Sequence, residues 1–354
     1  MLKRLSPREL LLNLAIEWES TLAREWLDAI RAITSAVVLK DLVAELERGN
    51  LDRAMALLNI DADRFARFEG AIVSAYNAGG QAVVGSMPKL IDPDGNRVHF
   101  SWGVRNMPAE QAMRQHAASL VDDLVGEQLT VARSVLVDGL SRGQNPRQTA
   151  LGLVGRINRR TGFREGGVLG LTPSSVQTLD KIYGGLRAGD TQAMRDYLGY
   201  QLRDKRFDGH VRRALEQGGS VPADAVDRIV TAYSNRALKY RADNLALTET
   251  NIALAKAKTD AFQQQIDAGK LDAQDLTKTW QRTVSRAPRD GHLAMVGKTI
   301  PFGKLFTLPS GHQCTGPHDP NLPASEIVNC KCLLELSVDF TAQALRKYRA
   351  RVGG

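Results

Sequence analysis

Cysteine and aromatic residues are scarce in this 354-residue chain, and it contains no long apolar run. Three cysteines cannot all pair with one another, so a secreted disulfide scaffold is not indicated and folding in a reducing cytosol is expected. No stretch approaches the ~20 apolar residues that span a bilayer. The apolar segment from Leu10 to Ile16 is interrupted by acids and lacks a cleavage site, so we expect no signal peptide. An aromatic content of 6%, with abundant Ala, Leu, Arg and Gln, favours helix over sheet.

Positive charge exceeds negative charge, with a net charge of +8 and a pI near 9.5. This balance suggests an anionic partner such as nucleic acid. Basic side chains that could contact phosphates without reading sequence cluster at Arg142, Arg147, Arg156, Arg159, Arg160 and Arg164. No aromatic residues are interleaved with them, so stacking on single-stranded bases is not supported. The alternative is that these arginines form an ordinary solvated helix face.

Helical spacing of apolar residues dominates residues 1–85, which we interpret as an N-terminal helical region. The third helix of this region is expected to begin at Asp61 or Asp63, either of which can cap it. Gly79 and Gly80 are expected to end it.

The remainder of the chain alternates between helical and irregular patterns. Asn145 is expected to cap a helix that runs to about Arg160, and one long helix, or two joined end to end, is expected from Pro222 to about Ala268. A turn signal at residues 91–95, followed by alternating residues, predicts a protruding β-hairpin. After about residue 268 the pattern changes to short alternating segments and proline-rich loops. The overall prediction is a mainly α protein, an elongated helical body with a small C-terminal α+β module. The predicted parts are a hairpin at 86–103, a helical region at 104–268 with an insertion at about 161–236, the module at 269–338 and a basic tail at 339–354.

Four landmarks follow one another in the last third of the chain. They are Thr248-Glu249-Thr250-Asn251 on a predicted helix, Trp280-Gln281-Arg282-Thr283, Arg286 with Asp290-Gly291-His292, and Asn329-Cys330-Lys331-Cys332. Each one alone is weak, but four in this order are hard to obtain by chance. The order resembles that of the phage head-morphogenesis family, the minor head proteins similar to protein F of phage Mu.

The resemblance implies a virion component rather than an enzyme. Its expected partners are the portal protein, a major capsid or scaffolding protein, and packaged double-stranded DNA bound without sequence preference; no membrane is expected in the assembled head. The protein would be assembled into heads in the host cytoplasm and would support head assembly and DNA packaging or ejection. The family motif corresponds here to Arg241, Thr248, Glu249, Asn251, Trp280, Asp290, His292, Cys330 and Cys332, in structural roles.

Two pairs of these residues suggest specific contacts. Arg241 and Glu249 are eight residues apart, nearly on one helix face, and are expected to form a pair that docks the helix on the C-terminal module. Asp290 and His292 could act as an acid and base, or His292 could bind a metal. The preferred interpretation is that Asp290 caps a turn while His292 bonds to backbone, because no nucleophile has an interpretable spacing.

The cysteines allow two interpretations. Cys330 and Cys332 would face the same side of a strand. With Cys314 and a histidine (His292, His312 or His318), they would form a Cys3His set suited to structural zinc, although Cys-x-Cys is tighter than the usual zinc knuckle. The preferred interpretation is that the thiols are core packing residues and that the protein has no cofactor. A zinc- or cysteine-dependent hydrolase that uses the C-terminal module is the alternative function.

Overall fold

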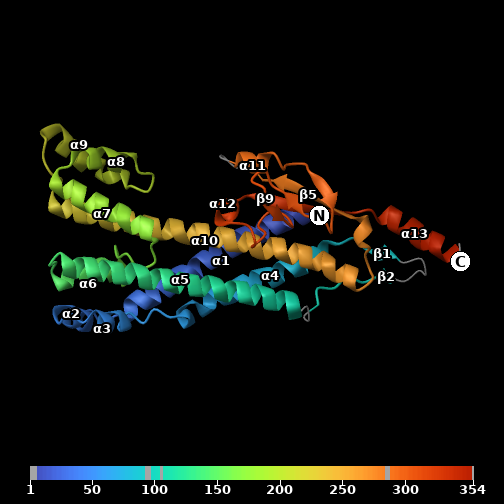
Figure 1. Cartoon of the computed structure of the whole chain (residues 1–354), viewed down its shortest axis with the longest axis horizontal. Helices are drawn as coiled ribbons and strands as arrows, with labels where there is room; N and C mark the ends of the chain where they lie inside the picture. Colours follow the sequence, from blue (N-terminus) through green and yellow to red (C-terminus); the bar gives the residue numbers. More distant parts are fainter. Residues whose placement is uncertain (1–5, 92–96, 104–106, 284–287, 353–354) are drawn as a thin grey trace. The chain divides into compact units, whose positions relative to one another are not determined.

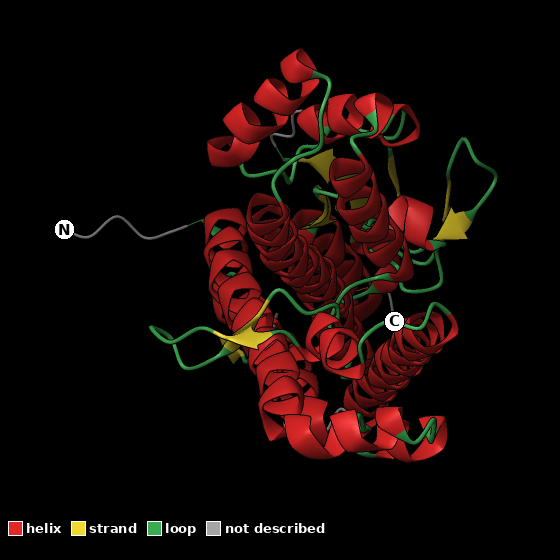
Figure 2. Cartoon of the chain, turned by 90° about the vertical axis from the view of Figure 1, so that its left-hand side faces the viewer, coloured by secondary structure: helices red, strands yellow, loops and turns green. Residues whose placement is uncertain are grey.

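The structure is a computed structural model that describes residues 6–91, 97–103, 107–283 and 288–352. Helices account for most of this described chain, and strands are short (Figure 2). The longest strands lie in the C-terminal third. The prediction of a mainly α protein with a small C-terminal α+β module is therefore confirmed.

The chain forms two compact units, each assembled from separate stretches of sequence. Unit 1 comprises residues 1–22, 70–117 and 244–354, and unit 2 comprises residues 23–69 and 118–243. The predicted linear division does not follow these units, because long helices contribute residues to both. These helices are α1 (Pro7–Ala36), α4 (Ala66–Ser86), α5 (Met107–Ser141) and α10 (Ala223–Asp267).

Unit 2 contains mostly short helices (Figure 1). They are α2 (Leu39–Glu47), α3 (Leu51–Ala56), the 3-10 helix η1 (Ala62–Phe65), α6 (Pro146–Val154), α7 (Pro173–Ala188), α8 (Thr191–Gly199), η2 (Lys205–Phe207) and α9 (Asp208–Gln217). Helix α6 begins where predicted, because the Asn145 side chain accepts hydrogen bonds from the backbone of Arg147 and Gln148. The strands β3 (Arg156–Ile157) and β4 (Arg164–Glu165) form a small antiparallel pair.

One hydrophobic core joins α7, α8, α9 and the first part of α10. Leu186, Tyr197 and Val211 are fully buried there, together with Ile229 of α10. Helix α10 continues without a break from Ala223 to Asp267, so of the two predicted arrangements the structure has the single long helix. The predicted insertion at about 161–236 therefore ends inside a helix, because the packing of α10 carries it past residue 236.

Unit 1 is centred on the strand β5 (Leu276–Arg282), which lies between two antiparallel neighbours. Its side chains alternate, and Leu276, Lys278 and Trp280 are buried. The sheet and its surroundings consist of β6 (Thr299–Pro301), β9 (Cys332–Val338), the pair β7 (Phe306–Thr307) and β8 (Gln313–Cys314), the 3-10 helix η3 (Ala273–Asp275), and the helices α11 (Asp290–Leu293), α12 (Ala324–Ile327) and α13 (Phe340–Val352).

The predicted hairpin is present as β1 (Leu90–Ile91) and β2 (Arg97–Val98), while its turn at residues 92–96 lies outside the described residues. The predicted stop at Gly79 and Gly80 is wrong, since α4 continues through them to Ser86. A Cβ atom at Gly80 would lie 2.3 Å from the Trp102 ring. These glycines therefore allow close packing within the helix instead of ending it.

No helix in the described part of the chain combines the length and the apolar character needed to cross a membrane.

Replacing Leu276 with Ala is expected to lower the free energy of unfolding of unit 1 by roughly 2–5 kcal/mol, because it opens a cavity beside a fully buried side chain. Leu305→Ala is the matched control in the same unit, since Leu305 is 51% exposed, and it should cost less than about 0.5 kcal/mol. Urea unfolding followed by tryptophan fluorescence measures both. Equal losses in the two variants would contradict the placement of Leu276 in the core.

Candidate functional site

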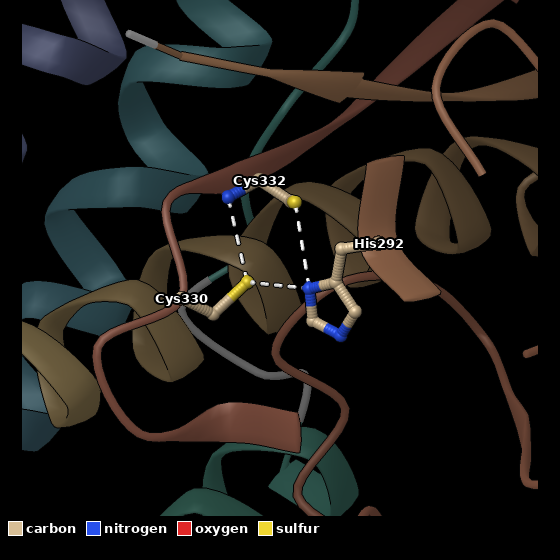
Figure 3. A group of neighbouring side chains, drawn as sticks. All are labelled: His292, Cys330 and Cys332. Carbon is tan, nitrogen blue, oxygen red and sulfur yellow. Dashed lines mark hydrogen bonds between the residues drawn. The ribbon is translucent and has the colours of Figure 1, made fainter. Parts of the chain in front are cut away.

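Three buried side chains meet in unit 1: His292 of α11, Cys332 at the start of β9, and Cys330 two residues earlier. Both sulfur atoms face the same ring nitrogen, His292 Nδ1 (Figure 3). The Nδ1 to Sγ distances are 3.4 Å for Cys330 and 3.6 Å for Cys332. All three potential ligand atoms lie within 4.8 Å of one another. The arrangement is a compact cluster of one nitrogen and two sulfur donors.

The opposite nitrogen of the same ring contacts a carboxylate. His292 Nε2 lies 2.9 Å from Glu326 Oε2 on α12. Burial acts to raise the pKa of Glu326, but hydrogen bonds from Ser310 and His292, together with nearby positive charge, hold that pKa below its ordinary value. An ionised carboxylate only accepts hydrogen bonds, so Nε2 carries a proton, and in the neutral ring Nδ1 then presents its lone pair to the sulfurs.

A tight turn brings the two cysteines together. Asn329 adopts the left-handed conformation with φ of 59°, and the Cys330 backbone N–H donates to the Ile327 carbonyl at the end of α12. The Cys332 backbone N–H then donates to Cys330 Sγ over 3.4 Å. The expectation that both cysteines lie on one strand is wrong, because Cys330 precedes β9. Turn geometry, and not strand alternation, makes the thiols converge.

The thiols influence each other's ionisation. A hydrogen bond from Cys330 is the main reason that the pKa of Cys332 falls to about 5, although burial opposes this. The same contact, with burial, raises the pKa of Cys330. The Cys332 sulfur in turn raises the pKa of His292.

Trp280 forms the wall of this cluster. Its ring packs edge-on against the His292 ring, with centroids 5.4 Å apart, and against Phe306 at 5.5 Å. The side chain is fully buried on β5. The family-motif tryptophan thus fixes the orientation of the imidazole through packing.

Other residues predicted for this site lie elsewhere. Cys314 is buried on β8, where burial raises its pKa to about 11, and it is not part of the donor group found among the described residues. Asp290 is exposed and is the first residue of α11, so it is not the capping residue. The cap position belongs to Arg289, which forms no side-chain capping hydrogen bond. His292 bonds to side chains instead of backbone. Arg286 lies outside the described residues.

The predicted Arg241–Glu249 pair does not form. Eight residues along a helix span about 12 Å, too far for the two side chains to meet. Within unit 1, buried Glu249 instead contacts His116 of α5, with Oε2 and Nε2 2.7 Å apart. Within unit 2, Arg241 pairs with Glu127 of α5 and lies over the Trp26 ring. Both motif residues therefore bind α10 to α5, and neither docks it on the sheet.

A largely apolar cavity of about 430 Å³ lies in unit 1. Residues from three landmarks line it: Asn251, Gln281 and Cys332. Thr248 is buried on α10 a turn earlier. The first turns of α1 also line the cavity, with Leu11 among them, a contribution that no sequence motif signals. Residues of three landmarks thus line one cavity.

One ammonium group lies at this cavity. Lys258 lines it, and its Nζ donates to the Leu334 carbonyl over 2.7 Å. Burial lowers the pKa of Lys258 to about 8, with Glu335 opposing the shift. Neither Lys258 nor Glu326 was identified from the sequence, because a lone charge on a helix carries no spacing signal.

The predicted DNA-contacting arginines lie in unit 2. Five are exposed, just after α5, on α6 and around the β3–β4 turn: Arg142, Arg147, Arg156, Arg159 and Arg160. Arg164 differs, because its half-buried guanidinium donates to the backbone carbonyls of Gly155 and Val37. Arg164 thus has a structural role. Arg142 is exposed but pairs with Asp138 over 2.6 Å, whereas Arg147, Arg156, Arg159 and Arg160 are exposed to a partner.

Comparison with known proteins gives one partial relative. No family model matches the chain, and no solved structure matches it. A Bacillus subtilis (strain 168) protein described as "Uncharacterized protein YqbB" is 31% identical over 102 residues. The similar region covers 28% of this chain and 31% of that protein, so the chain spans less than a third of the relative's length. The description of that protein names no function.

Replacing Lys258 with Met is expected to raise the free energy of unfolding at pH 7 by roughly 1–3 kcal/mol, because no charge then has to be desolvated. The pKa of Lys258 is lowered from 10.5 to about 8 by folding. The unfolded chain therefore binds more protons between these values, so the wild-type penalty is complete below pH 8 and disappears above pH 10.5. Urea unfolding across this range should show the gain shrinking as pH rises.

Lys304→Met is the control for this comparison, since Lys304 is exposed in the same unit. Its effect on the free energy of unfolding should be small and independent of pH. A Lys258→Met gain that stays constant up to pH 10.5 would contradict a buried ammonium.

Proposed function

We propose that this chain is a minor head protein of a tailed phage, a low-copy virion component that associates with the portal and the procapsid. The observation that carries the proposal is the ordered set of four motifs in residues 241–336. Residues of three of them line one cavity in unit 1, although they are up to about 80 positions apart in sequence. Motif residues that gather around one apolar cavity support a binding role.

The chemistry of the cavity supports binding of a protein segment. Its lining is mostly aliphatic, with Leu11, Leu254 and Leu336 among the side chains, and a few polar groups at its edges. Apolar cavities with few polar groups favour the burial of apolar side chains from a partner. We therefore assign unit 1 to the contact with the portal or a capsid protein.

The exposed arginines of unit 2 supply the second contact, with packaged DNA. Arg156, Arg159 and Arg160 lie close together in sequence around the β3–β4 turn, and all are exposed. Exposed guanidinium groups neutralise phosphates irrespective of base sequence. A protein inside a head filled with DNA has to contact phosphate groups without reading the base sequence.

A cysteine-dependent hydrolase is the second candidate, because Glu326, His292 and Cys332 lie in the order of a carboxylate–imidazole–thiol arrangement. Two features favour the structural role. The imidazole and the thiols are all buried. Moreover, Cys330 and Cys332 both contact His292 Nδ1, whereas a general base accepts the proton of a single nucleophile.

Virion association is expected to depend on the portal. When the chain is co-expressed with the capsid, scaffolding and portal proteins of its own phage genome, quantitative mass spectrometry should find it in purified procapsids. Omitting the portal gene should remove it while the major capsid protein remains, which serves as the internal control. Equal recovery with and without the portal would contradict portal association, and absence from both preparations would contradict the minor head assignment.

DNA binding is expected to be independent of sequence and to weaken steeply with salt. Changing Arg156, Arg159 and Arg160 to Gln should reduce the slope of log K against log salt by about 0.9 for each phosphate that is no longer neutralised. Fluorescence anisotropy with two unrelated duplexes measures this slope.

The control variant changes three exposed arginines elsewhere in unit 2, Arg48, Arg53 and Arg67, to Gln. It removes the same total charge as the first variant. If the DNA contact is confined to the β3–β4 turn, the salt slope of this control should stay close to that of the wild type. Identical slopes in all three proteins would show that the β3–β4 arginines form an ordinary solvated surface that does not contact DNA.

A further inference from the structure

We propose that His292, Cys330 and Cys332 bind one zinc ion through Nδ1 and the two Sγ atoms, with water as the fourth ligand. Among the described residues, these three form the donor group, and they come from two segments about 40 positions apart. The inference does not depend on the proposed virion role. It rests on four features of the cluster: its size, the tautomer of His292, the surplus of thiols and the bonds to the ligands.

The size of the cluster matches a zinc coordination sphere. With Zn–S bonds of about 2.3 Å and Zn–N bonds of about 2.05 Å, a tetrahedral site separates a nitrogen and a sulfur ligand by about 3.6 Å and two sulfurs by about 3.8 Å. The measured Nδ1 to Sγ distances are 3.4 and 3.6 Å. Both nitrogen–sulfur distances thus match a zinc site, and the two sulfurs lie within 4.8 Å of each other.

The tautomer of His292 is the one that a metal requires. Its Nε2 lies 2.9 Å from the Glu326 carboxylate, which accepts the ring proton. Nδ1 faces both sulfurs (Figure 3). Metal-binding histidines commonly donate the other ring proton to a carboxylate in this manner. Glu326 would therefore orient the ring and make Nδ1 a better ligand.

Hydrogen bonding alone does not explain why two sulfurs face one ring nitrogen. Nδ1 shares a single proton, as donor or as acceptor, so it can form a full hydrogen bond with one of the two sulfurs. A metal ion satisfies both sulfurs and the nitrogen together. The backbone N–H of Cys332 also donates to Cys330 Sγ, which favours the thiolate form that binds metal.

The donor types select zinc. Thiolate and imidazole are preferred by zinc, whereas magnesium and calcium prefer oxygen ligands. Two cysteines and one histidine with a water in the fourth position is a known zinc ligand set. Binding replaces the proton on each protonated thiol, which is released to solvent. The ion would hold α11 to the turn before β9 in a module whose small core leaves a thin stability margin.

The test is elemental analysis of the full chain purified without chelator. About one zinc per chain is expected, and it should be released by chelator or by acid, which protonates the ligands. Cobalt(II) added after zinc removal should give the near-ultraviolet thiolate-to-cobalt band and the visible bands of a tetrahedral site. Cys330→Ser and Cys332→Ser should each lose the metal.

Two variants keep the outcome interpretable if a ligand variant does not fold. Cys314→Ser removes a buried cysteine of the same unit outside the cluster and should retain full zinc content. Glu326→Gln leaves all three ligands in place and should weaken zinc binding about 10- to 100-fold in competition with a chromophoric chelator.

Several outcomes would overturn the proposal. One is a folded chain that contains no zinc and takes up neither zinc nor cobalt(II). Another is zinc that remains at the wild-type level in Cys330→Ser and Cys332→Ser chains. A third is equal zinc loss in Cys314→Ser, which would place the metal elsewhere.

Discussion

The antiparallel pairing of β5 with β9 determines the geometry of unit 1. Seven residue pairs run from Leu276 opposite Val338 to Arg282 opposite Cys332. This register puts Trp280 on the buried face and begins β9 at Cys332, beside the imidazole that Trp280 supports. A shift by one residue would turn Trp280 outward. The cluster, the cavity and the core of the sheet therefore depend on one strand pairing.

The cavity and the cluster share Cys332, which links three of the sequence landmarks to one region of unit 1. Asn251 on α10 lines the cavity from a helix, while Gln281 and Cys332 line it from the sheet. Glu249, two positions before Asn251, contacts His116 of α5. These residues thus join α10 to α5 and line the cavity beside the sheet of unit 1.

Local signals in the sequence predicted much of the fold. Asn145 predicted the start of α6 because its cap uses groups within three residues. The pattern after Pro222 predicted one long helix or two joined end to end, and α10 is the former. Contacts between distant residues were not predictable in this way. Arg241 pairs with Glu127 instead of Glu249, and nothing in the spacing of Glu326 indicated that it would orient His292. Gly80 illustrates the same limit, since its partner is Trp102 and not the end of a helix.

The division of the chain between the two units has a consequence for biosynthesis. Unit 2 draws only on residues 23–243, whereas unit 1 needs residues from near the N-terminus and β9, which ends at Val338. During translation, the partners of unit 2 are all available about 100 residues before those of unit 1. The first turns of α1, with Leu11 among their apolar residues, must wait for the last of their partners until β9 has been synthesised. A chain arrested before β9 would expose this apolar surface and be a target for chaperones and proteases.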